Sequence, residues 1–203
     1  MYKLYDFLPS GNSYKVRLLL NLLDISYERI NINILKQETR TQQFLDKNSN
    51  GRIPLLEIAQ DRFLAESNAI LYYLSQGTKF FPIDKYAQAQ VMQWLCFEQY
   101  SHEPFIATAR YWISILKQAE KHQEELKQKH RIGKAALKVM EQHLSKHDFF
   151  VGEAYTIADI GLYAYTHVAD EGGFDLAEFS AILVWIERIK NHPKHILIND
   201  RGN

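Results

Sequence analysis

Two places where a predicted strand meets a predicted helix carry the side chains best suited to chemistry. Ser10, Gly11 and Asn12 follow the first strand and precede an apolar helical stripe, so a hydroxyl, an amide and free backbone N–H groups can face an anion such as a thiolate. Glu66 and Ser67 occupy a second junction, where the serine and the helix start suit a carboxylate and the glutamate suits an ammonium group. The second junction can therefore hold an amino-acid terminus, although each serine also fits the plainer role of a helix cap.

A proline and three basic residues can extend such a site. Pro54 stands beside the edge of a third predicted strand, and a cis Ile53–Pro54 bond would turn the Ile53 amide and carbonyl toward an extended peptide. The dipeptide alone favours the trans bond, because only about 5–6% of X-Pro bonds in folded proteins are cis. Lys36, Arg40 and Arg52 can meet a carboxylate at the other end of the peptide, although basic residues more often only solvate the surface.

Other chemistries lack their motifs. No G-x-S-x-G elbow, G-x-G-x-x-G turn or G-x-x-x-x-G-K-[ST] loop occurs, which disfavours acyl transfer and nucleotide binding. His143 and His147 have the i, i+4 spacing of two metal ligands, but no HExxH glutamate or nearby third ligand accompanies them, so we expect no metal site. The only cysteine is Cys96, which excludes an intrachain disulfide, a CxxC motif and a cysteine-based zinc site; we expect it in the core.

Hydrophobic periodicity predicts the elements that position these residues. Alternation and turn residues place strands at residues 2–7, 27–34, 55–58 and 62–65, and helical stripes place helices at 13–24, before 46 and at 67–76. The last two strands are joined so tightly that they must be antiparallel. The order βαβαββα is therefore expected over residues 1–76.

After residue 76 the sequence pattern predicts helices only. Residues 77–85 form a linker, and 86–203 an all-helical domain that begins with one long helix over 86–116, kinked or interrupted by Pro104. Thr156-Ile-Ala-Asp159 is a capping sequence whose role is folding. The expected fold class is α/β plus all-α.

Composition and net charge limit the classes of protein and partner to be considered. The 203 residues are 46% hydrophobic, and 24 basic residues balance 24 acidic ones, which is ordinary globular usage. Zero net charge gives no bulk field for nucleic acid or an anionic membrane, so we expect neither as a partner. The first residues lack a signal-peptide pattern and no stretch reaches the roughly 18 apolar residues of a membrane span, so a reducing cytoplasm is the expected location.

Four motifs in order resemble those of the cytosolic glutathione transferase family, and the resemblance spans essentially the whole chain. They are Ser10-Gly-Asn-Ser-Tyr-Lys-Val-Arg17, Asn48-Ser-Asn-Gly-Arg-Ile-Pro54, Glu66-Ser-Asn-Ala-Ile-Leu-Tyr-Tyr-Leu74 and Thr156-Ile-Ala-Asp159. The first is similar to the serine- or asparagine-type turn of bacterial, theta-like and nu-like members. The resemblance implies a thioredoxin-like first domain that binds glutathione and a helical second domain.

The resemblance also implies roles for individual residues. The peptide before Pro54 is expected to be cis, with Ile53 pairing with the cysteinyl backbone of glutathione. Glu66 and Ser67 are expected to hold the γ-glutamyl end, and Arg52 and Lys36 the glycine carboxylate. Ser10 or Asn12 is expected to stabilise the thiolate, and the resemblance leaves that choice open.

The implied activity is that of a glutathione S-transferase that directs the thiolate to small hydrophobic electrophiles or peroxides. Glutathione is then a co-substrate, with no tightly bound cofactor, and the protein is expected to be a homodimer. The electrophile is expected between the domains, near Tyr100, His102 and Tyr111. The alternatives are a non-catalytic glutathione-binding or regulatory protein, and a nu-type glutathione-dependent peroxidase or disulfide-bond reductase.

Overall fold

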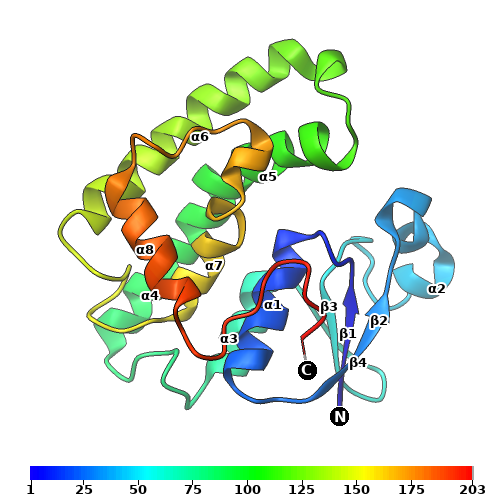
Figure 1. Cartoon of the computed structure of the whole chain (residues 1–203). Helices are drawn as coiled ribbons and strands as arrows, with labels where there is room; N and C mark the ends of the chain where they lie inside the picture. Colours follow the sequence, from blue (N-terminus) through cyan, green and yellow to red (C-terminus); the bar gives the residue numbers. More distant parts are fainter. Residues whose placement is uncertain (203) are drawn as a thin grey trace. The chain divides into compact units, whose positions relative to one another are not determined.

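The chain is described by a computed structural model over residues 1–202 and divides into two compact units. The first unit contains Met1–Gln76 together with residues 193–202, and the second is Gly77–His192. Figure 1 shows the strands gathered in the first unit and a set of helices in the second. The α/β plus all-α fold class is confirmed.

A four-stranded mixed sheet in the order β2-β1-β3-β4 forms the base of the first unit. Its strands are β1 (Tyr2–Asp6), β2 (Tyr27–Asn31), β3 (Leu55–Ala59) and β4 (Arg62–Ala65). β1 is parallel to β2 and antiparallel to β3, and β3 and β4 are antiparallel, as predicted from their tight connection. β2 ends earlier than expected because Asn33 Oδ1 accepts hydrogen bonds from the Leu35 and Lys36 N–H groups and starts a 3₁₀ turn.

Helices complete the predicted βαβαββα order. They are α1 (Gly11–Leu22), α2 (Gln42–Leu45) and α3 (Ser67–Ser75), with 3₁₀ turns at Ile34–Lys36 and Glu38–Arg40. α1 and α3 pack against each other on one side of the strands, and α2 lies on the other (Figure 1). Almost every residue of α1 is buried, including Leu18, Leu19 and Leu20, so this helix is a rigid support for the turn at its start.

The tail, residues 193–202, packs on the first unit, whereas the sequence pattern assigns it to the helical domain of 86–203. One of the residues that hold it is Arg17, whose Nη1 forms a buried ion pair with Asp6 Oδ1 at 2.5 Å. A guanidinium has five donors, and one carboxylate does not satisfy them all. Arg17 Nη2 therefore also donates to the carbonyl oxygen of Ile198 at 2.6 Å, which fastens the tail.

The second unit consists of helices and helical turns. They are α4 (Lys85–Phe97), a π-helical turn (Glu98–His102), α5 (Glu103–Arg110), a second π-helical turn (Tyr111–Ile115), a 3₁₀ turn (Glu120–His122), α6 (Gln123–Leu144), α7 (Ile157–Thr166), a 3₁₀ turn (Ala169–Gly172) and α8 (Ser180–Lys190). The predicted long helix over 86–116 is thus interrupted. Pro104 lies in the first turn of α5, where its missing N–H costs no helical hydrogen bond.

α7 is the buried centre of the second unit, with every residue from Ile157 to Thr166 out of solvent. The predicted capping role is confirmed, because Thr156 and Asp159 form a complete capping box at its start.

Cys96 is exposed, so the prediction that it belongs to the core is wrong. Val91, Trp94 and Leu95 occupy the buried face of α4 and turn Cys96 toward solvent.

Candidate functional site

The turn between β1 and α1 presents Ser10 at the helix start. Ser10 is the N-cap, with φ −74° and ψ 121°, and its Oγ accepts a hydrogen bond from the Ser13 N–H at 3.3 Å. A hydroxyl has two lone pairs and one proton, so capping leaves the proton of Ser10 for another acceptor. Ser10 can therefore act as a cap and as a hydrogen-bond donor to an anion.

Asn12 and Ser67, which the sequence places at separate junctions, meet in the structure. Ser67 Oγ donates a hydrogen bond to Asn12 Oδ1 at 3.2 Å, and the Ser67 residue is only 5% exposed. The starts of α1 and α3 are therefore linked side chain to side chain. A group bound at one helix start lies close to a group bound at the other.

Lys15 lies beneath this link, and the sequence reasoning did not identify it. Its side chain is fully buried, and its Nζ donates to Ser67 Oγ at 3.3 Å and to Asn68 Oδ1 at 3.4 Å. Lysine is almost never fully buried unless it is paired. The sequence feature that could have identified Lys15 is its place three residues after Asn12, within the apolar stretch of α1.

Glu66 has a backbone conformation that favours glycine. Its φ is 68° and its ψ 115°, and its side chain is exposed. Within residues 1–202, the Glu66 side chain makes no capping hydrogen bond to α3. Non-glycine residues held in such regions cost about 1–3 kcal/mol and cluster at functional sites. The carboxylate is instead contacted by Asn50 Nδ2 at 3.4 Å.

The loop before β3 is organised by Asn48. Asn48 Nδ2 donates to the Arg52 carbonyl oxygen at 2.8 Å, and Asn48 Oδ1 accepts from the Asn50 N–H at 3.1 Å. The Ile53–Pro54 bond that follows is cis, as the resemblance predicts. The loop and Glu66 thus border the same part of the first unit.

Of the three basic residues considered, Arg40 has the clearest contact with this loop. Arg40 Nη1 donates to the Asn50 carbonyl oxygen at 3.2 Å. Gly51 has a φ of 61°, which L side chains rarely adopt, and a Cβ atom there would lie 3.0 Å from the Thr39 carbonyl oxygen, so the position favours glycine. Lys36 is exposed in the first 3₁₀ turn and Arg52 is exposed in the loop.

Tyr5 is the one phenol of β1 near this region, and its hydroxyl donates to Glu57 Oε2 at 2.9 Å. Burial, followed by the hydrogen bond to Glu57, raises the pKa of Tyr5 to about 12. The phenol therefore stays neutral at pH 7 and is committed to a carboxylate, which fits its position in the strand.

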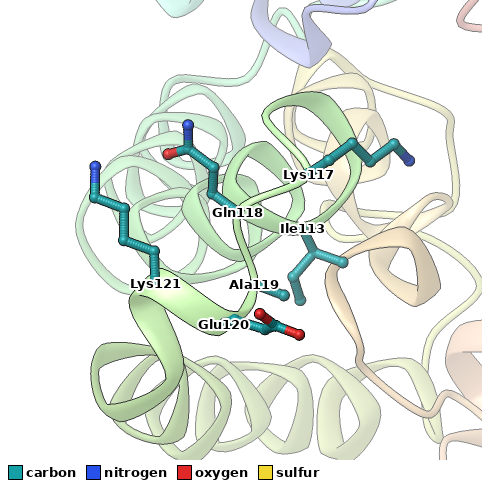
Figure 2. A pocket seen from close by; sticks show the side chains of 6 residues that line it. All are labelled: Ile113, Lys117, Gln118, Ala119, Glu120 and Lys121. Carbon is teal, nitrogen blue, oxygen red and sulfur yellow. The ribbon is translucent and has the colours of Figure 1, made fainter.

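The three predicted electrophile contacts lie in and beside the π-helical turns of the second unit. Tyr100 is 85% exposed, and Tyr111 is half-buried at the start of the second turn. His102 is buried, with its Nε2 2.9 Å from Thr166 Oγ1, and so ties the first turn to α7. A hollow shown in Figure 2 is lined by other residues of this unit, Ile113, Lys117, Gln118, Ala119, Glu120 and Lys121.

Across residues 1–202, no group of three or more His, Cys, Asp or Glu side chains could hold a metal ion. None of the helices described combines the length and the apolar character that crossing a membrane requires.

Comparison with known proteins identifies relatives over nearly the whole chain. Family models of the glutathione S-transferase N-terminal and C-terminal domains match residues 1–76 and 94–193. A crystal structure of a glutathione S-transferase from Pseudomonas fluorescens is 49% identical, covers 98% of this chain and 99% of its own, and superposes with a TM-score of 0.96.

Two curated relatives are more distant. Disulfide-bond oxidoreductase YfcG of Escherichia coli is 26% identical, and the match covers 92% of this chain and 89% of YfcG. Transcriptional regulator URE2 of Saccharomyces cerevisiae is 28% identical, and the match covers 95% of this chain and 66% of URE2. The chain belongs to the glutathione S-transferase family, as its four motifs predict.

Proposed function

We propose that the protein is a glutathione transferase whose first unit binds glutathione as a co-substrate and stabilises its thiolate. The carrying observation is the hydrogen bond between Ser67 and Asn12, which joins the junction suited to a carboxylate to the junction suited to a thiolate. Glutathione has both groups on one small peptide. Ser10 and Asn12 are the proposed donors to the thiolate.

The remaining contacts follow the length of the peptide. Glu66 and Ser67 take the γ-glutamyl ammonium and carboxylate groups at the start of α3, where the helix dipole favours a negative charge. Ile53, before Pro54, pairs with the cysteinyl backbone. The glycine carboxylate meets Arg52 and Lys36, and Arg40 is added because it contacts the same loop.

Thiolate stabilisation requires only a modest free energy. A free thiol has a pKa near 8.5, and each unit by which binding lowers it corresponds to about 1.4 kcal/mol. A charge-assisted hydrogen bond and a helix start can supply this amount. The bound thiolate then attacks the electrophile, forming the S–C bond as the leaving group departs, while the thiol proton passes to solvent.

Tyr100, His102 and Tyr111 are the proposed contacts of a small hydrophobic electrophile or peroxide. Tyr100 is the most accessible of the three, and the bond of His102 to Thr166 gives His102 a supporting role.

We further propose a cytoplasmic homodimer with a role in detoxification. Light scattering on the purified protein tests the dimer, and a monomer at micromolar concentration would contradict it.

A second candidate is a glutathione-dependent disulfide-bond reductase or peroxidase, favoured by the similarity to YfcG and by Asn12 in the turn. The only cysteine, Cys96, lies in α4 of the second unit, so both electrons would come from two glutathione thiols, which form one glutathione disulfide. The similarity to URE2 supports the third candidate, a non-catalytic regulator on the same fold. Substrate panels with haloarenes, hydroperoxides and a model disulfide separate the three.

The decisive experiment measures ionisation of bound glutathione. Thiolate ultraviolet absorbance is followed against pH for wild type, Ser10→Ala and Asn12→Ala. We expect wild type to lower the thiol pKa and each variant to reverse part of the change. A wild-type complex whose thiol titrates like free glutathione would contradict the proposed catalysis.

A calorimetric titration tests the γ-glutamyl contact. Ser67→Ala is expected to weaken glutathione binding by about tenfold, the loss of one hydrogen bond to a charged group. Ser75→Ala is the matched control, because Ser75 is a buried hydroxyl at the other end of α3 that donates to the Tyr72 carbonyl oxygen. Equal affinities of Ser67→Ala and the control would reject the contact.

A further inference from the structure

The backbone just before Ser10 is held by a side chain of α1. Proline has no N–H, so the only polar group of the Leu8–Pro9 peptide is the Leu8 carbonyl. Arg17 Nη2 donates to this carbonyl oxygen at 2.8 Å. The Ser10 N–H then donates to the Phe7 carbonyl oxygen at 2.8 Å and closes the turn. The orientation of the turn that presents Ser10 therefore depends on Arg17.

Three contacts fix the guanidinium of Arg17, whose side chain is fully buried. Its Nη1 is paired with Asp6 Oδ1 at the end of β1. Its Nη2 carries two protons, and it donates to the Leu8 carbonyl oxygen at 2.8 Å and to the Ile198 carbonyl oxygen at 2.6 Å. Because a guanidinium is a rigid planar fork, it cannot turn away from Leu8 without breaking the other two contacts.

The Ile198 carbonyl is in turn held in place by the way the tail is bound to the first unit. Asn21 Nδ2 donates to the Lys194 carbonyl oxygen at 2.8 Å, and the Tyr27 hydroxyl donates to the Arg201 carbonyl oxygen at 2.8 Å. These two contacts lie on either side of Ile198 along the chain, and both acceptors belong to the backbone. They therefore fix the path of the tail across α1, and with it the carbonyl that Arg17 uses.

We propose that Arg17 is a positioning residue that holds the turn before Ser10, and that the tail supports it through the Ile198 carbonyl oxygen. The inference rests on the proposed function, in which the Ser10 hydroxyl donates to the glutathione thiolate. Ser10 Oγ also accepts from the Ser13 N–H, so its proton is the one that remains for the thiolate. The effect of the buried Arg17 is carried to the thiolate by the backbone before Ser10.

Arg17→Lys tests the positioning role. Lysine keeps the positive charge beside Asp6, but its single nitrogen cannot reproduce the three contacts of the fork. The Leu8 carbonyl then loses its donor, and the Ser10 hydroxyl moves out of line with the thiolate. We expect the pKa of the bound thiol to rise by about one unit, so that the thiolate fraction at a pH below it falls about tenfold. Calorimetry is expected to show glutathione affinity near that of wild type, since the Ser67 contact is unchanged.

Arg29→Lys is the matched control. Arg29 Nε lies 3.1 Å from the other carboxylate oxygen of Asp6, but Arg29 belongs to β2 and its remaining hydrogen bonds go to Asn31. We expect this variant to keep the wild-type thiol pKa. An equal rise in Arg17→Lys and Arg29→Lys would assign the effect to the ion pairs of Asp6 and would overturn the proposal.

A double-mutant cycle tests whether Arg17 acts through Ser10. In a Ser10→Ala background, Arg17→Lys is expected to have little further effect on the thiol pKa. An effect that persists at full size in this background would reach the thiolate by another route and would also overturn the proposal.

The contribution of the tail is tested by a double variant, Asn21→Ala with Tyr27→Phe. It removes two donors to the tail without changing a charge at pH 7, because burial raises the pKa of Tyr27 to about 12. The thiol pKa is expected to rise as in Arg17→Lys, but by less. Leu197→Ala is the control, since the Leu197 side chain is an exposed part of the tail. A double variant with the thiol pKa of this control would reject the support from the tail.

Hydrogen exchange without ligand tests the turn directly. The Ser10 N–H is expected to be protected in wild type and to exchange about tenfold faster in the double variant, as for the local loss of one hydrogen bond. The amides of β3 report opening of the whole unit and are expected to be unchanged. Equal acceleration at Ser10 and in β3 would overturn the proposal. An unprotected Ser10 N–H in wild type would do so even if Arg17→Lys did not fold.

These arms distinguish the two levels of inference. A wild-type complex that does not lower the thiol pKa rejects the proposed function and leaves the support of the Ser10 turn to be decided by hydrogen exchange. A wild-type complex that lowers the pKa, together with an Arg17→Lys complex that lowers it equally, rejects the role of Arg17 alone.

Discussion

Two helix starts in this protein use polar residues in opposite ways. At α7, Thr156 Oγ1 accepts a hydrogen bond from the Ala158 N–H at 3.3 Å, and Asp159 Oδ2 accepts from the Thr156 N–H at 2.9 Å. At α3, the residue in the capping position is Glu66, which has a φ of 68° and, within the described chain, no side-chain capping bond. One start is closed by its own side chains and the other is left open.

The difference separates a stabilising role from a binding role. The α7 start is buried, so any backbone donor left without a partner there would cost stability. The α3 start keeps an exposed carboxylate on a strained backbone. Within the described chain, this carboxylate forms no capping hydrogen bond that would offset the strain. Removing polar groups at α7 should therefore reduce the free energy of unfolding, whereas removing them at α3 should reduce ligand affinity.

The largest expected effect is that of Asp159→Ala. Asp159 accepts hydrogen bonds from the Phe150 N–H, the Trp185 Nε1–H and two groups of Thr156. Each buried donor left without a partner costs about 1–3 kcal/mol, so we expect the free energy of unfolding to fall by about 3–5 kcal/mol. Urea denaturation measures the loss.

The control is the exposed Asp170→Ala in the same unit, which is expected to change stability by less than about 0.5 kcal/mol. Similar losses in Asp159→Ala and Asp170→Ala would mean that the closed start of α7 does not stabilise the fold.

The pH dependence of stability tests the same carboxylate. Burial raises the pKa of Asp159 from 3.8 to about 6, while its hydrogen bonds oppose the rise. Because the folded-state pKa exceeds the unfolded value, the protonated form contributes stability below about pH 4, and this contribution is lost as pH rises through about 6. The shift corresponds to about 3 kcal/mol.

The measurement compares wild type with Asp159→Asn, which cannot ionise. The free energy of unfolding of wild type relative to the variant is expected to fall by that amount between pH 4 and pH 7. A constant difference across this range would show that Asp159 ionises without penalty.

A smaller loss is expected at Thr156. Thr156→Ala removes the acceptor for the Ala158 N–H, and loss of such a cap costs about 1–2 kcal/mol. Thr156→Ser keeps the hydroxyl and is expected to recover most of the loss in thermal unfolding. Equal destabilisation by alanine and serine would assign the effect to the threonine methyl group.

The sequence predicts the closed start better than the open one, and the reason is physical. Thr156 and Asp159 satisfy each other within one turn, so their spacing alone identifies the capping box. The same holds for β1, β3, β4 and the βαβαββα order, which follow from local periodicity and turns. The end of β2 at Asn31 was missed because Asn33 accepts two hydrogen bonds from Leu35 and Lys36 and starts a 3₁₀ turn, although the strand pattern of the sequence continues past it.

The candidate site depends on residues far apart in the chain. Residue types identified Ser10, Asn12 and Ser67, but only the structure brings Asn12 and Ser67 to 3.2 Å. Lys15 was missed because a lysine in a helix is normally a surface residue, and its burial is decided by the packing of α1 on α3. The tail was misassigned for a similar reason, since it is held by distant side chains such as Arg17 and Tyr14.

The smallest expected effect on stability, and the sharpest test of the comparison, is at Glu66. Glycine accepts a positive φ without strain, so Glu66→Gly is expected to raise the free energy of unfolding by about 1 kcal/mol after its higher unfolded-state entropy is deducted. Glu66→Ala keeps the strained backbone and is expected to gain nothing. Both variants lack the carboxylate, and both are therefore expected to bind glutathione less tightly by a similar factor. Denaturation and calorimetry on the pair separate backbone strain from ligand contact. If the glycine variant is no more stable than the alanine variant, the start of α3 carries no backbone strain. The two helix starts would then differ only in where their carboxylates lie.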